Sequence, residues 1–383
     1  MNFQSPPSRL PDVGTTIFTV MSRMAMEYGA INLSQGFPDF PVDSELITLV
    51  SKYMQEGYNQ YAPMPGVPVL QKTIAEVATQ LYGCTINAES EVTITAGGTE
   101  ALYAAITAFV TAGDEVILFD PCYDSYDPAI RLNGGIPVHL KLHPPDFTID
   151  WDRVRKAITK RTKMILINTP HNPTGTVFSA NDMKQLEEIA VTHGLLVLSD
   201  EVYEHIIFDN LTHQSVLRSP ALAAQCIALF SFGKTFHVTG WRMGYVIAPA
   251  PLTHEIRKAH QFITFSIHHP VQRAFAEYMQ QPERYRTLGA YYQQKRDYFL
   301  DQLQGSSFEP IPSHGSYFQL LSYKNISAKT EVEMAEELTK KHKVACIPVS
   351  VFYHGGDDHK LLRFCFAKNE NTLRQAAEIL RKL

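Results

Sequence analysis

One lysine stands where its amine could serve as a nucleophile. Lys234 comes shortly after the apolar run at residues 226–230, which predicts a buried strand, and Gly233 allows the chain to turn sharply between them. A lysine at the end of a buried sheet is partly desolvated, which lowers the pKa of its amine and favours attack on a carbonyl. A P-loop also ends in glycine and lysine, but it requires glycine where this chain has Ala228. A solvated surface lysine is the competing interpretation.

Two segments have the composition of a phosphate site. Gly98 and Thr99 separate a strand expected at residues 91–95 from a buried helix expected at 101–110. A helix that begins directly after glycine presents free backbone N–H groups to an anion, although a tight strand-to-helix turn explains the same residues. Arg242 lies between two glycines, which would let a phosphate approach its fixed positive charge closely.

Polar and aromatic side chains follow further predicted strands. Tyr123, Asn172 and Asp200 each lie just beyond a strand, and Tyr203 follows Asp200 by three positions. Open α/β sheets bind ligands at the carboxyl ends of their strands, so we expect these side chains to share a site. Two prolines stiffen the loop around Asn172 and would fix its amide as a donor. A helix N-cap is the competing interpretation of Asp200.

Arg363 lies in an apolar strand expected at residues 361–366. A charged side chain there needs a partner or an anionic ligand, and a guanidinium suits a carboxylate. A structural ion pair or an outward-facing position is the competing interpretation. Pyridoxal phosphate chemistry would use all of these groups together, because that cofactor needs a lysine for its aldehyde, an acid for its ring nitrogen and a phosphate cradle.

Length, charge and cysteine content exclude several classes of protein. The 383 residues suffice for two domains, and a net charge of -5 without a basic run argues against nucleic-acid or membrane binding. Five scattered cysteines and the lack of a signal-peptide pattern predict a cytoplasmic protein. One polar loop contains metal-ligating residue types, but its composition favours a solvated turn, so we expect no metal: His354, Asp357, Asp358 and His359.

Predicted strands and helices alternate from about residue 91 to residue 248, which indicates an α/β fold with a largely parallel sheet covered on both faces. Long helical patterns at 251–279 and 285–303 then lead into an α+β region. We therefore expect a large cofactor-binding domain at residues 44–275. A small domain would combine residues 1–43 with residues 276–383, since chain termini often meet.

The sequence resembles the class I/II aminotransferases of the aspartate-aminotransferase fold type I along essentially its whole length. The motifs that carry the resemblance are Asn172-Pro173-Thr174-Gly175, Asp200 with Tyr203, Ser231 with Lys234, and Gly240, Arg242 and Gly244 in Gly-x-Arg-x-Gly. The resemblance implies a mostly parallel seven-stranded sheet in the large domain, a smaller α+β domain and a homodimer with shared active sites. It also implies pyridoxal 5'-phosphate as the cofactor.

The resemblance assigns roles to individual residues. The catalytic residues would be Lys234, Asp200 and Tyr203, with Lys234 bound to the cofactor aldehyde and, once released, moving the substrate proton. The ring would be held by Asp200, Tyr203, Asn172 and Tyr123, and the phosphate by Gly98, Thr99, Ser231, Arg242 and Tyr61 of the neighbouring subunit. Arg363 would bind the substrate carboxylate with help from Asn172 and the Gly36 backbone.

Within this superfamily, residues 32–40, 59–66 and 231–236 look like the methionine aminotransferases, which are close to the glutamine transaminase K/kynurenine aminotransferase group. No second arginine is placed for a side-chain carboxylate, and an apolar pocket would be formed by Phe18, Phe37, Tyr61 and Tyr123. We therefore expect ping-pong transfer of the amino group from a methionine-like or aromatic L-amino acid to a 2-oxo acid.

Two alternatives remain open at this point. A cysteine-S-conjugate β-lyase could use the same fold and cofactor. An aminotransferase-like transcription regulator is more remote, because the short segment ahead of the matched region contains no helix-turn-helix pattern and no basic bias.

Overall fold

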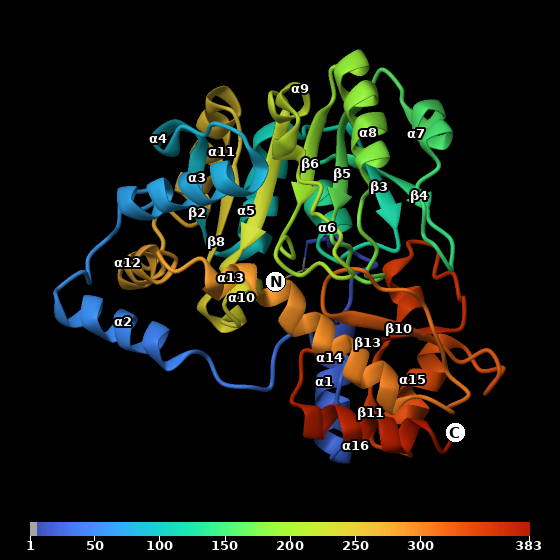
Figure 1. Cartoon of the computed structure of the whole chain (residues 1–383). Coiled ribbons are helices and arrows are strands. Elements are labelled where there is room, and N and C mark those ends of the chain that lie inside the picture. The colour runs from blue at the N-terminus through green and yellow to red at the C-terminus, as the bar shows by residue number, and fades with distance from the viewer. Residues whose placement is uncertain (1–5) are drawn as a thin grey trace, which may run out of the picture.

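A computed structural model describes residues 6–383, and within them a seven-stranded sheet forms the centre of the molecule (Figure 1). In the order in which they pair, the strands are β2 (Val92–Thr95), β8 (Gly244–Ile247), β7 (Cys226–Ser231), β6 (Leu196–Asp200), β5 (Thr162–Asn168), β3 (Glu115–Asp120) and β4 (Ile136–Lys141). Only β8 runs antiparallel to its neighbours in this sheet of the described chain. The prediction of a mostly parallel α/β sheet is therefore confirmed.

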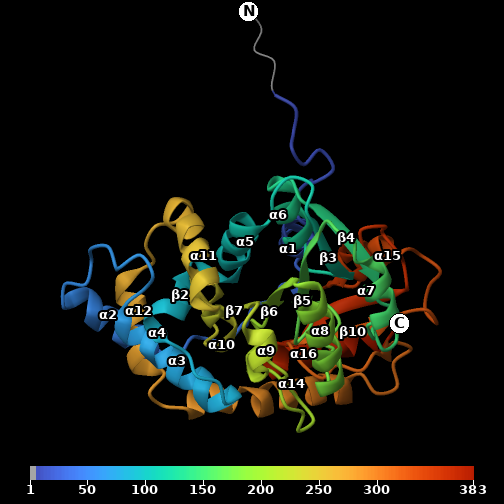
Figure 2. The ribbon, with the colours of Figure 1, turned by 90° about the horizontal axis from the view of Figure 1, so that it is seen from above.

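Helices cover both faces of this sheet, as Figure 2 shows. Neighbouring residues of one strand enter different cores, since Val116 packs with the cluster that contains α5, whereas Ile117 packs with the cluster that contains α3. Strands buried on both sides are apolar at nearly every position, which is why the sequence shows continuous runs there. The covering helices include α3 (Pro68–Tyr82), α5 (Gly97–Phe109), α6 (Tyr126–Leu132), α7 (Trp151–Ala157), α8 (Ala180–His193) and α11 (Ala250–Ile263).

The two ends of the chain build a second, smaller layer. Its strands are β1 (Ile31–Asn32), β9 (Glu309–Pro310), β10 (Phe318–Ser322), β11 (Val344–Ala345), β12 (Ile347–Pro348) and β13 (Leu361–Cys365). β1 pairs in parallel with β11, so the N-terminal segment lies beside the C-terminal one. The longer helices of this layer are α1 (Ile17–Tyr28), α14 (Leu288–Gln302), α15 (Glu331–Lys340) and α16 (Glu370–Leu380).

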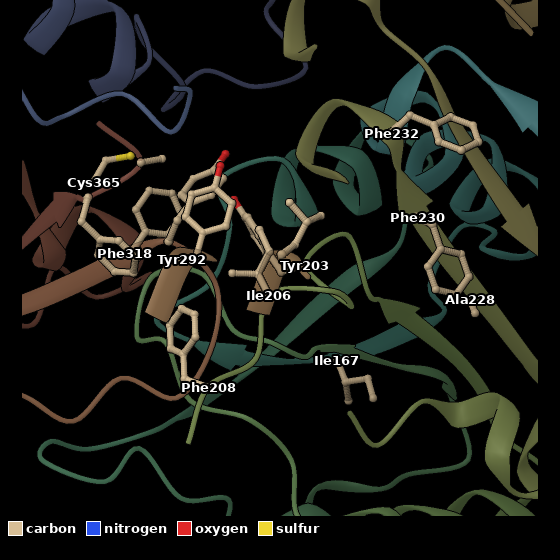
Figure 3. Packing of buried hydrophobic residues seen from close by; sticks show 14 of the residues in the cluster. Ile167, Tyr203, Ile206, Phe208, Ala228, Phe230, Phe232, Tyr292, Phe318 and Cys365 are labelled. Carbon is tan, nitrogen blue, oxygen red and sulfur yellow. The ribbon is translucent and has the colours of Figure 1, made fainter. Parts of the chain in front are cut away.

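One continuous apolar cluster joins the two layers (Figure 3). It extends from Phe230 in β7 to Phe318 in β10 and includes Tyr203 and Tyr292 between them. Burial of so much apolar surface fixes the layers relative to each other. The domain boundaries at residues 44 and 275 stay a prediction, and residues 1–5 of the expected small domain lie outside the described residues.

Several predicted elements differ from the structure. The single helix expected at residues 251–279 is two helices, α11 and α12 (His269–Tyr278), because Phe265 has a positive φ of 71° and Pro270 starts a new helix. The helix expected at 285–303 is divided between α13 (Glu283–Arg286) and α14. The other helices are α2 (Ser44–Gln55), α4 (Ala88–Glu91), α9 (Pro220–Ala223), α10 (Phe232–Thr235), and the 3-10 turns η1 (Val216–Arg218), η2 (Thr239–Trp241) and η3 (Val349–Phe352).

No helix within residues 6–383 is long and apolar enough to cross a membrane.

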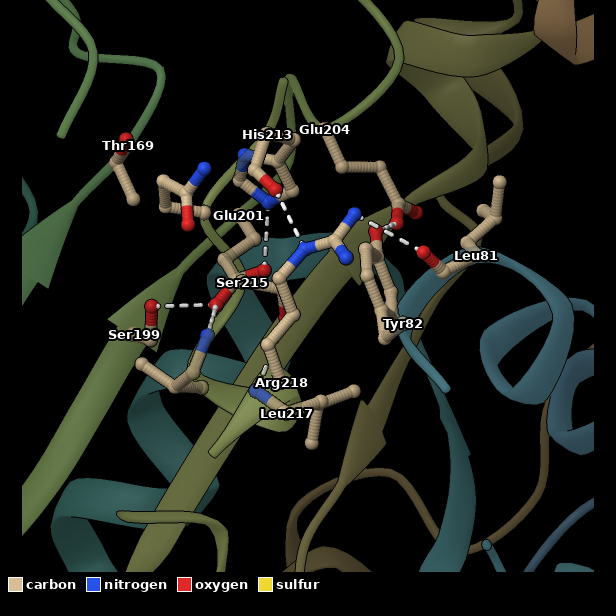
Figure 4. A network of polar contacts seen from close by, with 12 residues as sticks. Leu81, Tyr82, Thr169, Ser199, Glu201, Glu204, His213, Ser215, Leu217 and Arg218 are labelled. Carbon is tan, nitrogen blue, oxygen red and sulfur yellow. Dashed lines mark hydrogen bonds and ion pairs between the residues drawn. The ribbon is translucent and has the colours of Figure 1, made fainter. Parts of the chain in front are cut away.

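A polar network fixes the chain where it leaves β6 (Figure 4). Glu201 is fully buried, and its carboxylate accepts hydrogen bonds from Ser199 Oγ at 2.8 Å and Val216 N at 3.1 Å. His213 Nε2 lies 2.7 Å from the same carboxylate. A buried carboxylate is costly without such partners, so they hold Glu201 in place, and Asp200, one residue earlier, lines the cavity described below.

Replacing Glu201 by alanine should lower the free energy of unfolding by about 3 kcal/mol, because His213 and the Val216 N–H lose a buried partner. Urea unfolding followed by circular dichroism measures the change. The control is Glu255→Ala at an exposed ion pair with Lys258, which should leave the midpoint almost unchanged. Equal midpoints for the two variants would show that the network does not stabilise the fold.

Candidate active site

A cavity of about 370 Å³ opens at the carboxyl ends of β5, β6 and β7. Its position is the one at which open α/β sheets bind ligands. Among the described residues, the wall consists of Phe18, Gln35, Gly36, Gly98, Thr99, Leu102, Tyr123, Tyr126, Asn168, Asn172, Asp200, Val202, Tyr203, Ser231, Lys234, Arg242, Phe318 and Arg363. All of the predicted site residues except Tyr61 and Phe37 are therefore brought together in one chain.

Lys234 reaches this cavity from α10, the single helical turn that follows β7. Its Nζ lies 2.9 Å from the Tyr317 hydroxyl and 3.3 Å from the Gly36 carbonyl oxygen. Burial lowers the pKa of Lys234 to about 8, because removal from water disfavours the ammonium form. A useful fraction of the amine is therefore neutral and nucleophilic near neutral pH.

Asp200 is the last residue of β6, and no helix begins directly after it, so it is not the N-cap that the sequence also allowed. Its carboxylate accepts a hydrogen bond from the Tyr126 hydroxyl at 2.6 Å and one from Val202 N at 3.3 Å. Burial raises the pKa of Asp200 to about 6. The group can hold a negative charge above that pH and attract a protonated partner in the cavity.

The start of α5 lies beside the Arg242 guanidinium. Gly97 has a φ of +80°, and a Cβ built there would lie 2.9 Å from Arg242 Nη2, so glycine is needed for the guanidinium to reach the helix start. Arg242 donates from Nη1 to Thr239 O at 3.1 Å and forms no ion pair with any residue of the described chain. A helix N-terminus and a free guanidinium together attract a phosphate.

Arg363 is buried, with 1 % of its surface exposed, and carries no carboxylate partner within residues 6–383. Nη1 donates to Asn172 Oδ1 at 2.6 Å and Nη2 to Ser34 O at 3.1 Å, while the Nε atom has no partner in the described chain. The guanidinium carbon lies 3.9 Å from the centroid of the Phe318 ring. Burial lowers the pKa of Arg363 to about 10. Neither the ion pair nor the outward-facing position considered from the sequence is present, and the site favours an anionic ligand.

Two predicted site residues lie outside the cavity. Tyr61 is 80 % exposed, and its ring packs edge-on against Phe265. Phe37 is 44 % exposed, and its ring packs against the buried Lys368, whose Nζ lies 4.9 Å from the ring centroid. In a single chain Phe37 is therefore not part of the cavity wall.

Sequence reasoning missed two tyrosines that contact the central ionisable groups. Tyr126 donates to Asp200 from the short helix α6, which was not predicted, and Tyr317 contacts Lys234 from the segment before β10. Neither belongs to a recognised motif. The signal for Tyr126 was its position three residues after Tyr123, whereas nothing local to Tyr317 indicates where its hydroxyl lies.

The fold and this site define a class of protein. Residues 28–380 match the family of class I and II aminotransferases, and the chain belongs to that family. It is an aminotransferase, and enzymes of this family use pyridoxal phosphate.

Named relatives cover nearly the whole chain. The methionine aminotransferase of Escherichia coli is 50 % identical over 99 % of this chain and 98 % of its own length. The solved structure of YbdL from Escherichia coli, described with a methionine aminotransferase function, has a TM-score of 0.97 and 49 % identity, covering 99 % of this chain and all of its own. The kynurenine–oxoglutarate transaminase of Dictyostelium discoideum is 32 % identical over 99 % of this chain and 96 % of its length.

In the cofactor-free, full-length chain, labelling of Lys234 by an amine-directed reagent should have its midpoint near pH 8 rather than near the ordinary 10.5. The neutral amine reacts, so a lowered pKa makes about a tenth of the groups reactive at pH 7. Competitive labelling followed by mass spectrometry measures the midpoint, with the exposed Lys72 as an internal reference. A Lys234 midpoint near 10.5 would contradict its desolvation.

Proposed function

We propose that this chain transfers the amino group of an uncharged L-amino acid, methionine-like or aromatic, to a 2-oxo acid, with pyridoxal 5'-phosphate held in the cavity. The observation that carries the proposal is one cavity that contains both a desolvated lysine amine and a buried guanidinium without a carboxylate partner in the described chain. The Lys234 amine is available to a carbonyl, and the buried Arg363 guanidinium is available to a carboxylate.

The residues present fit the cofactor. The cradle formed by the start of α5 and Arg242 suits its phosphate, since no carboxylate of the described chain neutralises that guanidinium. Asp200 would hold the protonated ring nitrogen, Tyr123 would lie against the ring, and the ring oxygen would accept from Asn172 and Tyr203. The phosphate would also be bound by Gly98, Thr99 and Ser231. When bound, the cofactor withdraws electrons from the substrate α-carbon.

The chain's own residues then orient the substrate and move one proton. Arg363 binds the substrate carboxylate, and hydrogen bonds to Asn172 Oδ1 and Ser34 O fix the orientation of its guanidinium. Lys234, with a pKa near 8, can take a proton from the α-carbon and return it, because its neutral and charged forms are both populated near neutral pH.

The remaining wall of the cavity supports an uncharged side chain. Of the residues that line it, only Arg242 and Arg363 are arginines, and the proposal uses the first for the phosphate and the second for the α-carboxylate. Phe18, Leu102 and Phe318 present apolar surface instead. The name of the Escherichia coli relative also favours methionine as the donor.

A donor panel with one fixed 2-oxo acid tests this function. At least one of the donors methionine, phenylalanine, glutamine and kynurenine should have a kcat/KM about 100-fold higher than that of aspartate. The side-chain carboxylate of aspartate would be buried in the cavity without a partner. The Lys234→Ala variant is the matched control and should lose both turnover and the borohydride-reducible covalent link between chain and cofactor. Preference for aspartate, or full turnover without Lys234, would sink the proposal.

We also propose a homodimer in which Tyr61 of one chain reaches the phosphate of the other. Tyr61 and Phe265 form an exposed aromatic pair on the described surface, and Phe262, three residues before Phe265, is 85 % exposed. Exposed apolar surface of this kind marks interaction sites. We also propose two domains, a large one at residues 44–275 and a small one formed by residues 1–43 and 276–383, which the pairing of β1 with β11 supports. A cytoplasmic location is proposed as well, and five unpaired thiols support it.

Sedimentation of the holoenzyme should give a mass of two chains, that is, twice 43.1 kDa. Tyr61→Phe should raise the dissociation constant of the cofactor about tenfold, because one charge-assisted hydrogen bond to the phosphate is lost. Tyr28→Phe, at another exposed tyrosine, is the control. A single-chain mass at working concentrations would exclude the shared site.

A further inference from the structure

The Tyr317 hydroxyl lies where three distant parts of the chain meet. It is 2.9 Å from Lys234 Nζ and donates its hydrogen to the Gly36 carbonyl oxygen. The same carbonyl oxygen is 3.3 Å from Lys234 Nζ, so the three groups form a closed triangle. Lys234 lies in α10, directly after β7 of the large sheet, Tyr317 precedes β10 of the smaller layer, and Gly36 follows β1.

The direction of these hydrogen bonds defines what Tyr317 can do. A phenol has one hydrogen to donate, and here Gly36 takes it, so only oxygen lone pairs face the lysine. The Lys234 amine therefore meets two acceptors, the Tyr317 and Gly36 oxygens. Such acceptors favour the ammonium form and partly offset the desolvation of Lys234.

Packing leaves this triangle little freedom. Tyr317 is 1 % exposed, and its ring lies edge-on to Tyr203 with centroids 5.1 Å apart. A Cβ built on Gly36 would lie 2.9 Å from Phe318 Cζ and 3.4 Å from a ring carbon of Tyr317, so a larger residue would require these rings to shift. Burial raises the pKa of Tyr317 well above its usual value, which keeps the phenol neutral.

We propose that Tyr317 is a positioning residue for Lys234 and that, with the Gly36 carbonyl, it forms a resting site for the lysine amine whenever that amine is not covalently engaged. This inference rests on the proposed function, because only a lysine that is alternately bound and released needs a resting site. Since Tyr317 comes from the smaller layer, the amine is held correctly only when both layers are packed together.

Tyr317→Phe removes the hydroxyl and keeps the ring. In the cofactor-free, full-length chain, the midpoint of Lys234 labelling should fall by about one pH unit, since the ammonium form loses an acceptor. In the holoenzyme, kcat for the best donor should fall about tenfold, while KM should change less than about twofold because Arg363 and Asn172 are untouched.

The matched control is Tyr292→Phe. Tyr292 is fully buried, its ring is 5.8 Å from that of Tyr317, and its hydroxyl has no partner in the described chain. This variant should leave the labelling midpoint and kcat as they are in the wild type. The comparison separates loss of the Tyr317 hydroxyl from a general loosening of the aromatic cluster.

The inference would be overturned if Tyr317→Phe kept either the wild-type midpoint of Lys234 labelling or the wild-type kcat. It would also be overturned if Tyr317→Phe and Tyr292→Phe changed these two quantities equally. The labelling result does not depend on substrate or cofactor. If the wild-type chain transfers no amino group from any donor while the Tyr317→Phe midpoint still falls, the proposed function fails and the contact with Lys234 stands.

Discussion

The cost of burying charge governs this structure. Lys234, Asp200 and Arg363 share one cavity. Burial shifts the pKa of each group in the direction that favours its neutral form. Unpaired, such groups would destabilise the fold by several kcal/mol. Hydrogen bonds from or to Tyr126, Tyr317, Asn172 and backbone oxygens offset part of that cost and leave the groups able to bind ligands of opposite charge.

The parallel sheet concentrates these groups at one edge. Asn168 of β5 lies opposite Asp200 of β6, and β7 ends beside them at Ser231, so polar residues at the strand ends become neighbours. The Glu201 network holds the chain just beyond β6 in place. A rigid sheet can thus keep ionisable groups in fixed geometry, which loops alone would do less accurately.

The smaller layer supplies the part of the cavity wall that we propose for the substrate. Phe18, Gly36, Phe318 and Arg363 all come from the N-terminal and C-terminal segments. The large sheet thus contributes the groups at its strand ends, and the smaller layer contributes a guanidinium and aromatic side chains to the same cavity.

The sequence alone determined the alternating α/β architecture and the residues that lie after its strands, among them Lys234, Asn172 and Asp200. Apolar runs, glycines and prolines are local signals, so they are visible without knowledge of the fold. Only the tertiary structure decided which groups satisfy the buried charges, that Phe37 is exposed and does not line the cavity, and that the helix expected at 251–279 is broken. Those outcomes depend on packing between segments far apart in the chain, as the contact of Tyr317 with Lys234 and Gly36 illustrates.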